Sequence, residues 1–153
     1  MKRILALTLL ASCSLGCSSL FSKDEASADF DRETSAAEAR IKEDKVRSSL
    51  GRFEASIADF YKAEKRIPER LDQLVPKYLA EVPSLDLPVC GRETDKVQVY
   101  PADILRGGQV DGSRLKGTGR WGYVYNERQV VIFVDCLKSS SHGVPWYQER
   151  GVY

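Results

Sequence analysis

Four cysteines carry most of the chemistry that this sequence could perform. Cys13 and Cys17 follow a basic start and an apolar run, which is the pattern of a secretory signal. Export would bring the other two, Cys90 and Cys136, into an oxidising compartment, so we expect a disulfide between them. The alternative is that both are small apolar core residues. We predict no metal and no other cofactor, because the only histidine is His142 and no C-x-x-C pair occurs.

The end of the apolar run resembles the signal of bacterial lipoproteins, in which a peptidase cuts before a cysteine that carries a lipid. "LASC" puts a leucine three residues before Cys13, the better match, but it leaves a very short signal. "SLGC" puts a serine three residues before Cys17, a weaker match at a more usual length. We favour Cys17, with residues 1–16 as the signal peptide, and keep Cys13 as the alternative. An ordinary secretory signal that is cut further on remains a third interpretation.

This resemblance implies where the protein resides. Fatty acids such as palmitate would anchor it to a membrane of the bacterial cell envelope. A serine follows either cysteine, which implies the periplasmic face of the outer membrane. The 23 basic and 22 acidic side chains leave a net charge of +1, so no overall field favours nucleic acid as a partner.

Aromatic side chains near the C-terminus are the other candidates for a function. They could form a surface that stacks on cell-wall glycan or peptide, although aromatics at every second position of a strand also pack within sheets. The candidate surface consists of Trp121, Tyr123, Tyr125, Trp146 and Tyr147. His142 follows three serines and is interpreted as a solvated loop residue. No nucleophile elbow, P-loop or H-E-x-x-H motif occurs, and we therefore predict that the protein is not an enzyme.

The elements that would position these residues begin with a long helix. Residues 17–34 mix serine, alanine and charges without a period, which predicts a flexible tether. "SAAE" at residues 35–38 matches a capping box, so we expect a helix over residues 35–65. Its first half is polar and should protrude, whereas the second half has an apolar stripe: Val46, Leu50, Phe53, Ile57 and Phe60. A coiled-coil seam is a weaker interpretation, because barely two apolar heptads are present.

The rest of the chain predicts a cover segment and a small sheet. Pro68 starts a leucine-rich stripe over residues 68–80 that Pro76 interrupts, which indicates a short kinked cover helix. Residues 96–136 form the β region, which consists of the strand "KVQVY", a glycine-rich loop over residues 106–119 and a hairpin with its turn at residues 126–128. A C-terminal loop follows over residues 137–153. We expect a single α+β domain over residues 35–153, in which the long helix packs on a small antiparallel sheet.

The order of these pieces resembles the type IV pilins and the pseudopilins of type II secretion. The likeness lies in "FYKAEKRIPERLDQLVPKYLAEVP" followed by "GRWGYVYNERQVVIFVD". It implies a pilin-like head and protein partners in a secretion or pilus-like assembly. The apolar run precedes the candidate cleavage sites, so the filament-forming helix of pilins is missing, and no acidic cluster matches a calcium loop. We predict a non-catalytic, lipid-anchored envelope protein that acts through protein contacts, with a periplasmic binding module for glycan or peptide as the alternative.

Overall fold

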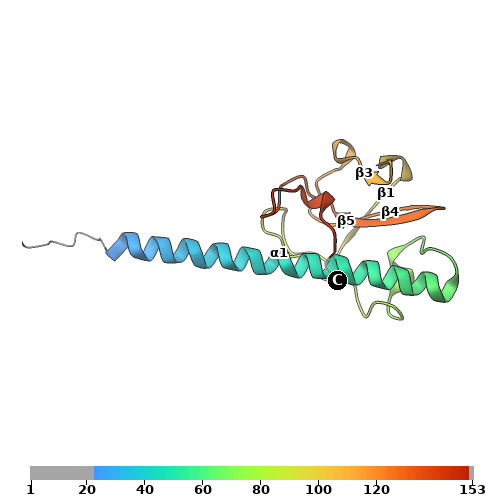
Figure 1. Cartoon of the computed structure of the whole chain (residues 1–153), viewed down its shortest axis with the longest axis horizontal. Coiled ribbons are helices and arrows are strands. Elements are labelled where there is room, and N and C mark those ends of the chain that lie inside the picture. Colours follow the sequence, from blue (N-terminus) through green and yellow to red (C-terminus); the bar gives the residue numbers. More distant parts are fainter. Residues whose placement is uncertain (1–22, 152–153) are drawn as a thin grey trace, which may run out of the picture.

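The computed structural model describes residues 23–151, with side chains from residue 27 onward. The predicted signal peptide and both candidate lipid-bearing residues, Cys13 and Cys17, lie outside the described residues. The architecture is α+β, as predicted: one long helix carries a small three-stranded sheet and a second, two-stranded sheet. Figure 1 shows these elements gathered over the C-terminal half of the helix, while the N-terminal half extends beyond them.

The helix, α1, spans Lys23–Glu64 and is 42 residues long. At 1.5 Å per residue it measures about 63 Å. It starts before Ser35, so the predictions of a tether up to residue 34 and of a capping box at Ser35 are wrong for the described residues. The physical reason is that no glycine or proline occurs from residue 23 to residue 34, and nothing there breaks a helix. The helix ends where Lys65 adopts a left-handed conformation with φ of 56°.

The apolar stripe in the second half of α1 provides the main contact with the folded part that follows the helix, which we call the head. Val46, Leu50, Phe53 and Phe60 are all buried, and Phe53 meets the Trp121 ring edge-on at 5.0 Å between centroids. These side chains belong to one hydrophobic core that also takes in the cover segment and the near face of the sheet. The predicted stripe is therefore confirmed, with Ile57 half-buried against the same core.

The cover segment is less helical than expected. Only one 3-10 turn forms, η1 at Leu71–Leu74, and hydrogen-bonded turns follow it instead of an α-helix. Pro76 has no amide hydrogen to continue a helix. Leu71 and Leu74 are buried as predicted, whereas Tyr78 is half-buried and packs edge-on against Phe60. The segment thus covers the core as expected, but as a chain of turns.

The three-stranded sheet has the order β1-β4-β5, with β1 at Val97–Tyr100, β4 at Trp121–Asn126 and β5 at Gln129–Val134. The hairpin of β4 and β5 is antiparallel, but β1 runs parallel to β4, so the sheet is mixed and the prediction of an antiparallel sheet is wrong for β1. The connection over residues 101–120 is long enough to return the chain to the same end of the sheet, which a parallel pair requires.

That connection covers the far face of the sheet. It contains η2 at Ala102–Ile104, the two-stranded sheet of β2 at Leu105–Arg106 and β3 at Gln109–Val110, and η3 at Gly112–Arg114. A second core forms there from Tyr100, Ile104, Val110, Val124 and Phe133. A last 3-10 turn, η4 at Trp146–Gln148, belongs to the C-terminal loop. The sheet is consequently covered on both faces, with α1 on one side and the connection on the other.

Candidate functional site

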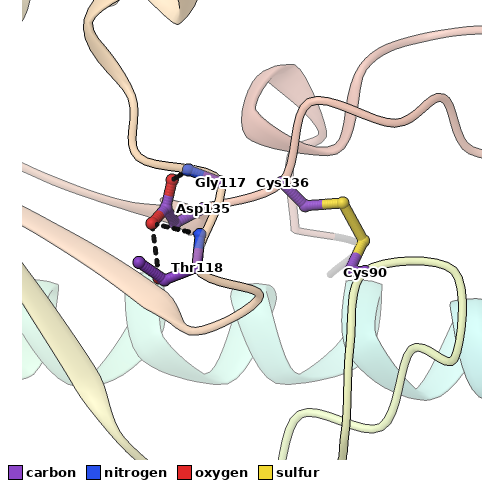
Figure 2. Close-up of a disulfide and its surroundings, with 5 residues drawn as sticks. All are labelled: Cys90, Gly117, Thr118, Asp135 and Cys136. Carbon is purple, nitrogen blue, oxygen red and sulfur yellow. Dashed lines mark hydrogen bonds between the residues drawn. A yellow bond between two sulfur atoms is a disulfide. The ribbon is translucent and has the colours of Figure 1, made fainter.

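The predicted disulfide is present. Cys90 and Cys136 are bonded, and their Cα atoms are 5.6 Å apart, within the ordinary range of about 4.4 to 6.8 Å. Cys136 lies two residues after the end of β5, and Cys90 lies in the irregular segment before β1 (Figure 2). The bridge therefore fastens the segment that follows the cover turns to the end of the sheet.

A buried carboxylate next to the disulfide holds the glycine-rich loop. Asp135 is fully buried, and it accepts hydrogen bonds from the amides of Gly117 at 3.0 Å and Thr118 at 2.9 Å and from the Thr118 hydroxyl (Figure 2). The Tyr100 hydroxyl donates a fourth bond at 2.8 Å and accepts one from the amide of Lys116. Burial, together with the adjacent carboxylate, raises the pKa of Tyr100 to about 12. With these four donors bound, Asp135 is a structural anchor of the loop and not a free base.

Sequence reasoning missed Asp135. The available signal was a lone carboxylate directly after an unbroken apolar strand and directly before a cysteine, where a charge without partners would be costly to bury. Its partners are residues 100, 117 and 118, and only the fold brings them together. The loop that was predicted simply as long and glycine-rich is therefore pinned at a defined place.

The candidate aromatic surface does not exist as an exposed platform. Trp121, Tyr123 and Trp146 are fully buried, and Tyr125 and Tyr147 are half-buried. The alternation that suggested a surface instead points Trp121 and Tyr123 at the core beneath α1.

The polar ends of two of these rings serve the fold. The Trp121 indole donates to the carbonyl of Pro83, and the Tyr123 hydroxyl donates to the carbonyl of Pro68, both at 2.7 Å. Burial raises the pKa of Tyr123 well above its ordinary value. Tyr123 thereby ties the sheet to the start of the cover segment, and Trp121 ties it to the chain just after that segment. The interpretation as packing residues replaces the one as a binding surface.

The C-terminal loop is held to α1 by a charged cluster around Arg47. This buried guanidinium lies 3.0 Å from Glu43 and 3.4 Å from Glu149, and it stacks on the ring of Trp146 at 5.2 Å. His142 is exposed, with Nδ1 3.7 Å from Glu149. The Ser140 hydroxyl donates to the same carboxylate and not to the histidine, so the residues do not form a relay of nucleophile, base and acid. The cluster attaches the loop to the helix.

The first part of α1 is exposed to solvent on all sides. Every side chain from residue 27 to residue 41 is exposed, including Phe30 at 69% and Ile41 at 68%. Eleven residues correspond to about 20° around a helix, so Phe30 and Ile41 lie on one line. By the same arithmetic this line faces about 160° away from Val46, which packs under the head. We call residues 27–41 the stalk; its apolar line points away from the head.

Comparisons with known proteins add no relative: no family model, curated protein or solved structure matches this chain. Within residues 23–151, no helix has the length and apolar character needed to cross a membrane. No group of three or more candidate metal ligands occurs among these residues either.

Proposed function

We propose that this protein is a non-catalytic, lipid-anchored component of the bacterial cell envelope, with a pilin-like head that acts through protein contacts in a secretion or pilus-like assembly. The observation that carries the proposal is the stalk. A single helix, the part of α1 before Lys42, runs about 28 Å beyond the head, between the lipoprotein-like N-terminal sequence and the folded domain.

The pilin-like interpretation is supported by the order of elements along the chain. A long helix, a proline-bounded cover segment and a small sheet follow one another, and the second half of the helix packs under the sheet. In pilins the first half of the helix is apolar and packs into the filament. The stalk here is polar, so we propose that the head is displayed from the membrane and not built into a filament core.

The stalk offers one place for a protein partner. An exposed helix of this length gains little from its own hydrogen bonds and is stabilised chiefly by packing. The line of Phe30 and Ile41 supplies the two large apolar side chains that a partner helix could cover. A partner that holds the stalk would therefore also set the position of the head, which is fixed at the other end of α1.

The anchor is tested by cell fractionation of three variants: Cys13→Ser, Cys17→Ser and the double variant. The double variant has no cysteine near the signal that could carry acyl chains. It should leave the membrane fraction, because stable anchoring needs two such chains. The single variant that behaves like the double variant identifies the lipid-bearing residue. Retention of the double variant in membranes would contradict the lipoprotein proposal.

The partner contact is tested by photo-crosslinking along the stalk. A photoreactive amino acid at Phe30 or at Ile41 should give the same discrete adduct in cells. The matched control is Ala39, which lies about 180° from Phe30 around the helix and is also exposed. Equal crosslinking from all three positions, or none from any, would remove the support for a partner on this line.

A further inference from the structure

A pocket of about 380 Å³ lies at the end of α1 that is far from the N-terminus. Three segments build it: the last turn of α1 with Tyr61, the joint that follows at residues 65–69, and the tip of the β4-β5 hairpin with Tyr125 and Arg128. Tyr61 is 54% exposed and Tyr125 is half-buried. Two tyrosine rings therefore line a concave site; the sequence analysis named Tyr125 as a candidate but not Tyr61.

The walls of this pocket are held in place by hydrogen bonds. Asn126 accepts from the amides of Arg128 at 2.9 Å and Gln129 at 2.8 Å, which fixes the two-residue turn of the hairpin. The bond from Tyr123 to the Pro68 carbonyl joins the sheet to the joint. The amide of Lys65 donates to the carbonyl of Tyr61 at 2.9 Å and closes the helix end. The pocket is a product of the fold and not of one mobile loop.

Charged side chains of both signs line the pocket. Lys65, Arg66 and Arg128 are exposed, and none of them forms an ion pair with another described residue; Arg66 lies over the Phe60 ring at 5.0 Å. Glu69 and Glu127 line the same pocket, and their side chains are likewise outside any ion pair among residues 27–151. Three cations and two carboxylates thus line one hollow, and the described residues show no ion pair between them.

We propose that this pocket binds a sugar chain that carries carboxylate groups. The cations would hold the carboxylate through charge-assisted hydrogen bonds. The glutamates would accept hydrogen bonds from sugar hydroxyls, which a purely anionic polymer without hydroxyls could not offer. The tyrosine rings would pack on the apolar face of a sugar ring. This mixture of groups fits an acidic glycan better than a simple anion.

The position of the pocket bears on the source of the ligand. The helix places it about 60 Å from residue 23. If the N-terminus is lipid-anchored, as proposed above, the pocket faces away from the headgroups of the anchoring membrane. An envelope polymer at that distance is the source that we favour.

The test is titration of the purified full chain with oligogalacturonate, a chain of carboxylate-bearing sugars, followed by calorimetry. Neutral chitohexaose serves as the control sugar, and vesicles of anionic phospholipid as the control for headgroups. Arg128→Ala should weaken oligogalacturonate binding about tenfold, the value of one hydrogen bond to a charged group. Arg92→Ala removes the same charge from an exposed position that lines none of the described pockets and should leave binding unchanged. Tyr61→Ala should weaken binding, whereas Tyr61→Phe keeps the ring and should retain most of it.

Three results would overturn the proposal: no binding of oligogalacturonate, equal loss in Arg128→Ala and Arg92→Ala, or vesicle binding that depends on Tyr61 and Arg128. Weaker binding at raised salt alone would not distinguish the variants, so the comparison is made at one ionic strength. Fractionation of the cysteine variants involves none of these residues. Failure of the anchor and failure of the glycan site are therefore seen in separate experiments.

Discussion

Replacing Asp135 by asparagine is the sharpest test of how the loop before β4 is held. One carboxylate oxygen accepts from the amide of Gly117, and the other accepts from Thr118 and from Tyr100. An asparagine can keep only one of these oxygens. The amide would orient its oxygen toward Thr118 and Tyr100, which leaves an NH₂ group facing the Gly117 amide.

The expected cost follows from this geometry. Asp135→Asn loses one hydrogen bond to a charged group and weakens the others, which corresponds to about 1.5 to 3 kcal/mol of the free energy of unfolding. Asp135→Ala removes all four acceptor contacts and should cost about 3 to 5 kcal/mol, because the buried Tyr100 hydroxyl loses its acceptor while the loop amides can bind water.

The matched control is Asp103→Asn. Asp103 pairs with Arg114 at 2.7 Å in the same connection, but its side chain is 63% exposed. A surface ion pair contributes about 1 kcal/mol or less, so this variant should unfold almost like the wild type.

Urea unfolding with the disulfide intact measures these differences, and amide hydrogen exchange locates them. Protection should fall at Gly117 and Thr118 in Asp135→Asn and stay unchanged in Asp103→Asn. Equal stability of Asp135→Asn and wild type, or an equal effect of both asparagine variants, would show that Asp135 does not anchor the loop.

Three further perturbations test the packing. Reduction of the Cys90–Cys136 bond should lower the free energy of unfolding by up to about 4 kcal/mol for the 46-residue separation. The unfolded, non-reduced protein should show no free thiol from this pair. Two alkylatable thiols would contradict the bond. Leu74→Ala empties a fully buried position and should cost about 2 to 5 kcal/mol in thermal or urea unfolding, so unchanged melting would make the cover segment a surface loop. The pKa of Tyr100 is about 12 in the fold, and burial also raises the pKa of Tyr123. Because both phenols ionise more easily in the unfolded chain, the free energy of unfolding should fall as pH rises from about 10 to about 12. Ultraviolet titration that shows both phenols ionising near pH 10 in folded protein would refute this.

Local patterns determined the elements that depend on neighbours in the sequence. The spacing of Val46, Leu50, Phe53 and Phe60 predicts which face of the helix is buried, because residues three and four apart lie on one face. The alternation around the β4-β5 turn predicts the hairpin for a similar reason, since its partner strand is adjacent in the chain. The disulfide was also predicted from the sequence, because the expected export signal contains Cys13 and Cys17 and leaves Cys90 and Cys136 as the pair that could bond in an oxidising compartment.

The tertiary structure decided strand direction, the burial of the aromatic side chains and the hydrogen bonds between segments that are distant in the chain. The direction of β1 was open, because alternation sets the two faces of a strand and not the direction of its neighbour. The roles of Trp121 and Tyr123 were open as well, since aromatic residues at alternate strand positions give the same sequence pattern whether α1 or solvent covers them. The role of Asp135 and the pocket at Tyr61 and Tyr125 were the features least predictable from the sequence. Their members come from segments that are separated in the chain, and no local spacing encodes a hydrogen bond or a charge cluster between segments that only packing brings together.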